Sequence, residues 1–326
     1  MKRRPLAIAL TSGLFTVLPM ASSAQDATDY PKSQIRIIVN FPAGGTADIL
    51  ARIVGQKLGE KWNQAVTIDN RVGAGGNIGA AATYTAEPDG YTLLVSPPGP
   101  MAINQSLFKT LPYDPRKFVP VTLLALIPNV IATRTDFPAG SVKELIAYAK
   151  ANPGKVSYAS QGNGSTSHLS GQMLANMAGI ELLHVPYKGE GPALIDLIAN
   201  RVDLFIGNIS GVIKFRQEKK VKFLAMANPR RSQVAADVPT AAEAGLPGFE
   251  ASAWFALVAP PGTPVAIAQK IQGAVAEALK LPDVQQRVLA LGGETAGHSP
   301  KELTDFLAAE RIRWKRVIET ANVTLD

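Results

Sequence analysis

The sequence contains no cysteine. A chain without cysteine forms no disulfide, offers no thiol nucleophile and holds no cysteine-ligated zinc. Histidine is scarce too: His168, His184 and His298 stand apart and do not cluster with carboxylates at metal-ligand spacing. These absences exclude a small disulfide scaffold and argue against a metal site, so the hydrophobic core alone must stabilise the fold.

Catalytic and nucleotide-binding signatures are also missing. The sequence has no Gly-x-Ser-x-Gly elbow and no Gly-Lys-Ser/Thr phosphate loop. The run "GAGGNIG" departs from a dinucleotide fingerprint, because Ile78 stands where the third glycine is required. We therefore expect no cofactor and no enzyme activity, and we interpret this turn as part of the wall of a cleft.

The first residues have the pattern of an export signal. Basic residues at 2–4 precede the apolar run 6–18, and small residues at 22–24 fit a signal-peptidase site. The apolar run is shorter than the roughly 20 residues that span a membrane. We predict a signal peptide over 1–24, cleavage after Ala24 and a periplasmic location.

The charge balance is mildly basic. The chain has 33 Lys and Arg against 26 Asp and Glu; three basic residues lie in the predicted signal, which leaves the mature chain at +4. No Lys/Arg-rich run is interleaved with aromatic residues, so we expect no nucleic-acid partner. The mild positive charge favours anionic ligands.

Strand and helix patterns alternate along most of the chain. Strands are expected at 35–39, 65–69, 91–96, 156–160, 182–187, 204–208, 221–227 and 254–260, with helical stretches between most of them. Short strands that are apolar on both faces and alternate with helices predict βαβ units and mostly parallel sheets. We interpret Trp254 and Phe255 as core residues rather than as a stacking platform.

The C-terminal part is predicted to be helical. Three helical segments follow the strand at 254–260, and the last opens with Ser299, Pro300 and Glu302. This spacing predicts an N-cap, a proline in the first turn and a capping box.

Two connecting stretches, 118–134 and 226–240, predict that the chain passes twice between two lobes. We assign 25–127 and 228–326 to the first lobe and 128–227 to the second. The expected class is an α/β protein with two lobes, each a mostly parallel sheet flanked by helices. A ligand would then bind between the lobes, at the carboxyl ends of the strands.

Four glycine-rich turns connect expected strands to expected helices, at 41–48, 71–80, 160–168 and 208–211. Glycine lets the backbone approach a ligand closely, and the first amides of a helix bind anions without help from Arg or Lys. We interpret the first and third turns as two sides of a carboxylate cradle, with a plain tight turn as the alternative for the first.

Individual side chains in these turns have more than one possible role. Asp48 is either a helix cap or a ligand acceptor. Ser165 and Thr166 could cap the next helix and also donate to an anion. His168 would lie in a first helical turn, where positive charge is disfavoured, so we expect a neutral imidazole that is either structural or in contact with ligand.

Several stretches together resemble a known family. They are "YPKSQIRIIVNFPAGGTADILARIVGQKL", "NRVGAGGNIGAA", "PDGYTLLV", "LPYDPRKFVPVTLL" and "WFALVAPPGTP". In this combination and order they resemble the Bug-type periplasmic solute-binding receptors of tripartite tricarboxylate transporters, over essentially the whole mature chain.

The resemblance implies a type II periplasmic-binding-protein fold that closes on a small carboxylate for membrane permease subunits. The implied ligand contacts are Phe41, Pro42, Ala43, Gly44, Gly45 and Asp48 in the first lobe, and Ser160, Gly164, Ser165, Thr166, His168, Tyr187 and Lys188 in the second. We add Asn208, which begins the fourth glycine-rich turn.

Three functions remain open at this point. The leading hypothesis is a monomeric solute-binding protein that holds a carboxylate unchanged. An exported hydrolase or transferase is the second, although no nucleophile with an adjacent base is evident. A ligand-sensing partner of a signalling receptor is the third.

Overall fold

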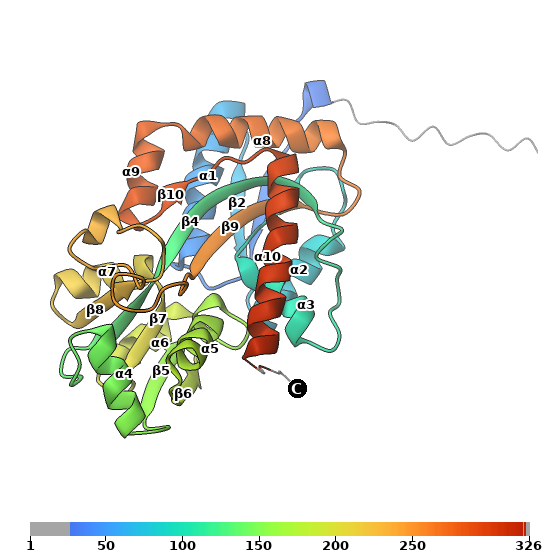
Figure 1. The fold of residues 1–326 in the computed structure, drawn as a ribbon. Coiled ribbons are helices and arrows are strands. Elements are labelled where there is room, and N and C mark those ends of the chain that lie inside the picture. The colour runs from blue at the N-terminus through green and yellow to red at the C-terminus, as the bar shows by residue number, and fades with distance from the viewer. Residues whose placement is uncertain (1–26, 322, 324–326) are drawn as a thin grey trace, which may run out of the picture.

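A computed structural model describes residues 27–321 and residue 323. The predicted signal peptide and its cleavage site lie outside these residues. Figure 1 shows the long curved strands β4 (Val119–Arg134) and β9 (Ser252–Ala259) through the middle of the molecule, with the helices α1 (Thr46–Trp62) and α8 (Val265–Leu279) toward one end and α4 (Val142–Ala151) and α6 (Glu190–Ile198) toward the other. Within the described residues, no helix is both long and apolar enough to cross a membrane.

The first lobe begins with parallel strands covered by helices. Its elements are β1 (Ile35–Val39), α1 (Thr46–Trp62), β2 (Val66–Asn70), α2 (Asn77–Tyr84) and β3 (Thr92–Ser96). Strand β1 lies between β2 and β3, and Ile37 is in register with Ile68 and Leu93. The carboxyl ends of β1 and β3 therefore lie at the same edge of the sheet.

The second lobe repeats this arrangement. Its elements are α4 (Val142–Ala151), β5 (Val156–Ser160), α5 (Thr166–Ala178), β6 (Leu182–Pro186), α6 (Glu190–Ile198), β7 (Leu204–Asn208), α7 (Ile209–Gln217) and β8 (Val221–Met226). Strand β5 pairs in parallel with both β6 and β7. The predicted βαβ units are thus present in both lobes.

The predicted crossing at 118–134 is a single strand, β4 (Val119–Arg134). Its part up to Pro128 pairs with β9 (Ser252–Ala259), and its part from Asn129 pairs with β7 and β8, all antiparallel. The expected parallel pairing therefore holds in the outer strands but not in the centre. Pro128 has no N–H to donate to a ladder, and the partner strand changes directly after it.

The second passage between the lobes runs beside the first. Ala227 N donates to Asn129 O at 2.8 Å, Asn129 N to Ala251 O at 3.1 Å, and Ala251 N to Ala227 O at 2.7 Å. Ala227 and Ala251, the two ends of the segment that links β8 to β9, are therefore tied to each other and to Asn129 of β4 by backbone hydrogen bonds.

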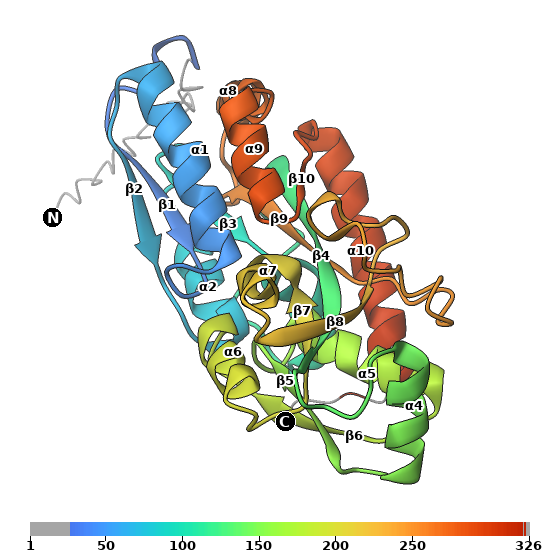
Figure 2. The same cartoon turned by 90° about the vertical axis from the view of Figure 1, so that its left-hand side faces the viewer.

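The C-terminal part packs against α1 and β4. It contains α8 (Val265–Leu279), α9 (Pro282–Ala290), the short strand β10 (Glu294–Thr295) and α10 (Pro300–Thr320). The predicted capping box of α10 is confirmed: Ser299 Oγ accepts from Glu302 N, and Ser299 N donates to the Glu302 carboxylate at 2.7 Å. Figure 2 shows α8 beside α1 on one face of the first lobe.

Several short elements were not expected from the sequence. Residues Gly99–Ile103 form a wide helical turn that continues into α3 (Asn104–Leu107). Two prolines just before this segment indicate a loop, but its Met101 and Ile103 are fully buried, so tertiary packing decides the outcome. Strand β10 is too short for its pattern to be distinguished from a turn.

A buried carboxylate joins α10 to the central sheet. Glu310 Oε2 accepts hydrogen bonds from Trp254 Nε1 at 2.7 Å and from Trp314 Nε1 at 2.8 Å. Both indole rings are almost completely buried, so no water reaches their N–H groups. Trp254 is a core residue, as we inferred from the sequence.

We expect Glu310→Ala to lower the free energy of unfolding by about 2–4 kcal/mol, because it leaves two buried indole N–H groups without an acceptor. Glu310→Gln keeps one acceptor oxygen and should lose less. The matched control is Glu319→Ala near the exposed end of the same helix, which should cost no more than about 0.5 kcal/mol. Urea unfolding measures all three, and equal losses in the two alanine variants would contradict this account.

Candidate functional site

A cavity of about 570 Å³ lies at the carboxyl ends of strands from both lobes. Of the residues implied by the sequence, Phe41 to Gly45, Ser165, Thr166, Lys188 and Asn208 line this cavity. Asp48, Ser160, Gly164, His168 and Tyr187 do not belong to its lining. The structure thus brings part of the expected set together around this cavity and places the remaining residues outside its lining.

The first turn is held in shape by Asp48. Gly44 N donates to Asp48 Oδ2 at 2.9 Å, Arg52 Nε to the same oxygen at 2.9 Å, and Asn70 Nδ2 to Oδ1 at 3.0 Å. Burial alone would raise the pKa of Asp48, but the hydrogen bonds from Arg52, Gly44 and Asn70 outweigh it and hold the pKa below its usual range. Asp48 is therefore an ionised clamp behind the turn.

The two glycines of this turn have different roles. Gly44 has φ +79°, a left-handed conformation that favours glycine. Gly45, the N-cap of α1, has φ −77°, and an added Cβ would meet only the Pro42 carbonyl oxygen, at 3.3 Å. The backbone of Gly45 thus suits any residue, and its lack of a side chain keeps this part of the cavity open.

Three helices begin at the cavity without a side-chain cap. The N-cap residues are Gly45 for α1, Gly189 for α6 and Asn208 for α7, and each lines the cavity without making a capping hydrogen bond. The first amides of a helix have no partner within it and lie at the positive end of its dipole. The cavity is therefore suited to negative charge.

The third glycine-rich turn is tied together by its own side chains. Ser165 caps α5 by accepting from His168 N at 3.2 Å, and it donates to Gly162 O at 2.6 Å. Gln161 N donates to Ser167 Oγ at 2.8 Å. Because these hydroxyls satisfy neighbouring backbone groups, α5 presents a capped N-terminus to the cavity, in contrast to α1, α6 and α7.

His168 belongs to a buried stack behind this turn. Its ring lies 4.1 Å from that of His184, which stacks on Tyr158 at 4.8 Å and hydrogen-bonds to Ser160 Oγ at 2.7 Å. Burial, with a smaller contribution from the charge of His184, lowers the pKa of His168 to about 3; burial also lowers that of His184 to about 4. The neutral imidazole expected from the sequence follows mainly from burial rather than from the helix dipole.

The two lobes touch across the cavity. Thr46 Oγ1 and Ser210 Oγ are 2.7 Å apart, and Asn208 Nδ2 donates to Thr46 Oγ1 at 3.4 Å. A Cβ on Gly189 would lie 3.1 Å from Pro42 Cγ. Figure 2 shows the start of α1 close to α6 and α7, so the lobes are closed against one another here.

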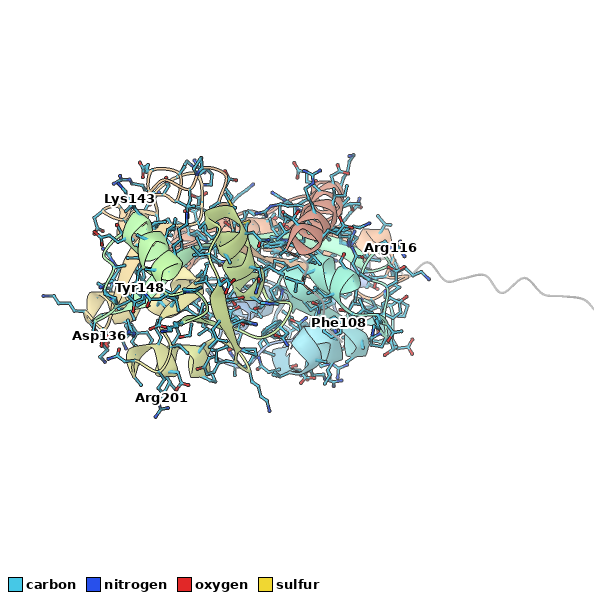
Figure 3. All side chains as sticks on the ribbon, turned by 60° about the horizontal axis from the view of Figure 1, so that its bottom comes forward. Phe108, Arg116, Asp136, Lys143, Tyr148 and Arg201 are labelled. Atoms are coloured by element: carbon cyan, nitrogen blue, oxygen red, sulfur yellow. The ribbon has the colours of Figure 1, made fainter. Side chains whose placement is uncertain are left out.

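A second cavity of about 780 Å³ adjoins the first. Phe41, Pro42, Gln161, Lys188 and Gly189 line both cavities, and the second also includes the turn 72–76. Figure 3 shows Phe108, which lines the second cavity, on the opposite side of the molecule from Tyr148 and Arg201.

Tyr187 lines this second cavity rather than the first. Its hydroxyl donates to Asp196 Oδ2 at 2.7 Å, and burial together with this carboxylate raises the pKa of Tyr187 to about 12. Its phenol is therefore neutral and already engaged with α6.

Several lining residues were missed from the sequence. They include Pro97 to Gly99, Glu190, Lys214 and Phe215. Gln161, Ser210 and Gly211 also line the cavity, in glycine-rich turns where other residues were assigned, and so does Phe255, which was interpreted as core. The proline pair directly after the strand at 91–96 was a usable signal, since residues at carboxyl ends of parallel strands meet at one edge. Among the described residues, no cluster of metal-ligating side chains is present.

The fold and the cavity define a two-lobed solute-binding protein. The chain belongs to the tripartite tricarboxylate transporter receptor family, whose model matches residues 50–323. The resemblance to Bug-type receptors is confirmed by BugT of Bordetella pertussis, which is 35% identical over 96% of this chain and 97% of BugT.

Solved structures confirm the predicted fold class. Rpa4515 of R. palustris, solved with adipate, has a TM-score of 0.88 and 37% identity, covering 91% of this chain and 100% of that chain. MatC of Rhodopseudomonas palustris, solved with bound malate, has a TM-score of 0.84 and 35% identity, covering 89% and 100%.

The histidine stack predicts loss of stability in acid. The unfolded chain takes up protons on His168 and His184 near the ordinary pKa of about 6.5, whereas the folded protein does so only near 3 and 4. Stability is thus complete above about pH 6.5 and falls as the pH drops, by on the order of 2 kcal/mol for His168 between about pH 7 and pH 5 and by less for the more exposed His184.

The variant His184→Gln tests this prediction, because its amide can still pair with Ser160 but does not titrate. Urea unfolding at both pH values should show a smaller acid loss in the variant, while the titration of carboxyl groups cancels in the comparison. If the free energy of unfolding falls equally with pH in both proteins, His184 is not a source of the acid instability.

Proposed function

We propose that this chain is a periplasmic receptor that captures a small organic carboxylate between its lobes and presents it, unchanged, to a tripartite-type membrane permease. The observation that most strongly supports this proposal is that α1, α6 and α7 all begin at one cavity with uncapped N-termini. Relatives solved with adipate and malate support a carboxylate. We propose that the receptor acts as a monomer.

The proposed ligand contacts combine backbone and side chains. We assign the carboxylate to the amides at the start of α1, with Phe41 to Gly45 around it, and the rest of the ligand to Ser165, Thr166, Lys188 and Asn208. Asn208 Oδ1 is buried without a hydrogen-bond partner among the described residues, so it has an acceptor free for a ligand donor.

We further propose that the lobes divide at 127/128 and 227/228 and open there. The proposal is supported by the change of partner strand after Pro128 and by the hydrogen bonds that join Asn129, Ala227 and Ala251. A ligand that contacts both lobes favours the closed state by its difference in affinity for the two states.

The first test is a thermal-shift screen with adipate, malate and citrate, against the neutral adipamide as the matched control for adipate. At about one hundred times Kd, a ligand should raise Tm by on the order of 5 °C, because it binds only the folded chain. Equal shifts with adipate and adipamide would refute an anion site. Recovery of a changed product after incubation would instead favour an enzyme.

We expect Gly45→Val to weaken carboxylate binding by on the order of a hundredfold or more, because its side chain projects into the space that the ligand carboxylate requires. The fold should survive, since only the Pro42 carbonyl oxygen lies near the added Cβ. Gly273→Val, in α8 and away from the cavity, is the control. A calorimetric affinity of Gly45→Val equal to that of the wild type would contradict the assignment of this turn to the carboxylate site.

A further inference from the structure

Glu190 is an acidic side chain in a cavity built for anions. It lines the cavity as the first residue of α6. The residue as a whole is half-buried, but its Oε1 atom is fully buried and has no hydrogen-bond partner among the described residues. No ion pair of Glu190 is present in that part of the chain.

The carboxyl group is packed against the first turn of α7. A Cβ placed on Gly211 would overlap the Glu190 carboxyl, so this glycine leaves the space that the carboxyl fills. The side chain therefore cannot move further toward α7, and its position at the cavity is fixed by backbone on that side.

Positive charge does not compensate Glu190. Lys188 and Lys214 line the same cavity, but both are exposed to solvent and neither perturbs the carboxyl. Ionisable groups on the elements packed near Glu190 have other partners. Arg134 of β4 pairs with Asp136 and Asp203, and the Tyr158 hydroxyl of β5 donates to His168 O. Asp196 of α6 accepts from Tyr187 and pairs with Arg201, and Asp48 of α1 pairs with Arg52. Strand β7 has no ionisable side chain.

Burial is the dominant influence on this group. It raises the pKa of Glu190 to about 7, while a hydrogen bond from the Gln161 side chain acts in the opposite direction. A neutral carboxyl also gains a donor O–H, which an ionised carboxylate lacks.

The geometry points to Glu190 as the residue that couples ligand capture to a proton: the cavity accepts a carboxylate with two or more charges only when the Glu190 carboxyl is neutral. An ionised Glu190 would add a like charge beside the ligand in a site of low dielectric. On capture at alkaline pH, the proton comes from solvent and stays on Glu190, which can then donate to the ligand. This inference rests on the proposed carboxylate-binding function.

Two classes of ligand should respond to pH in opposite directions. A dicarboxylate or tricarboxylate should bind more weakly as the pH rises, because the protonated fraction of Glu190 falls. An amino acid whose ammonium group faces Glu190 would show the reverse trend, since an ionised carboxylate would pair with it. Malate and aspartate share a carbon skeleton and differ in this group, so together they distinguish the two cases.

Titration calorimetry of the mature chain tests this coupling with whichever of adipate and malate stabilises it more. The affinity should fall roughly tenfold or more from about pH 6.5 to about pH 8.5, a range in which both of these dicarboxylates stay ionised. Two buffers with different ionisation enthalpies should reveal uptake of nearly one proton per ligand at the higher pH. The neutral histidines behind the site do not titrate over this range.

The variant Glu190→Gln should abolish both the proton uptake and the pH dependence while retaining the affinity measured at low pH. Glu181→Gln, an exposed carboxylate just before β6 that does not line the cavity, should behave as wild type. Tight binding by wild type with no proton uptake, or aspartate binding that strengthens with pH, would overturn the inference and leave the receptor function standing. Failure of all three carboxylates to bind would overturn the receptor function and this inference with it.

Discussion

Strand β4 belongs to the sheets of both lobes, and the position of the cavity depends on it. Along Val119–Pro128 it pairs with β9, and from Asn129 it pairs with β7 and β8. The change occurs where proline interrupts the row of donors. One continuous backbone passes through both sheets, and residues at the carboxyl ends of β1, β3, β5 and β7 line the same cavity.

That space offers a charged ligand backbone amides rather than a dominant ion pair. Helices α1, α6 and α7 start at the cavity without side-chain caps, so their first amides require a partner. No arginine lines the cavity among the described residues, and both lining lysines are exposed. Under the proposed function, such a site would recognise a carboxylate by position and dipole, most strongly when the closed lobes exclude water from the amides.

Local patterns could predict the parts of this structure that local chemistry decides. The capping box at Ser299, the βαβ units and the glycine-rich turns follow from spacing alone. The antiparallel pairing of β4 with β9 could not be predicted in this way, because a long apolar run does not specify its partner. The role of Asp48 likewise depends on Asn70, which comes from a different strand. His168 is neutral mainly because the fold buries its ring, with a smaller contribution from His184, which only the fold brings next to it.

Glu190 illustrates why the remainder of the site was not evident. An acidic residue at the start of a helix is normally stabilised by the helix dipole and is expected to lie on the surface. Its burial is determined by Gly211, which is distant in sequence and leaves the space for the carboxyl. Backbone amides bind any carboxylate alike, so discrimination among carboxylates must come from the few side chains that share the cavity. Glu190, whose Oε1 is buried without a hydrogen-bond partner among the described residues, is the strongest of these, because its charge state decides whether a second negative charge is tolerated beside it.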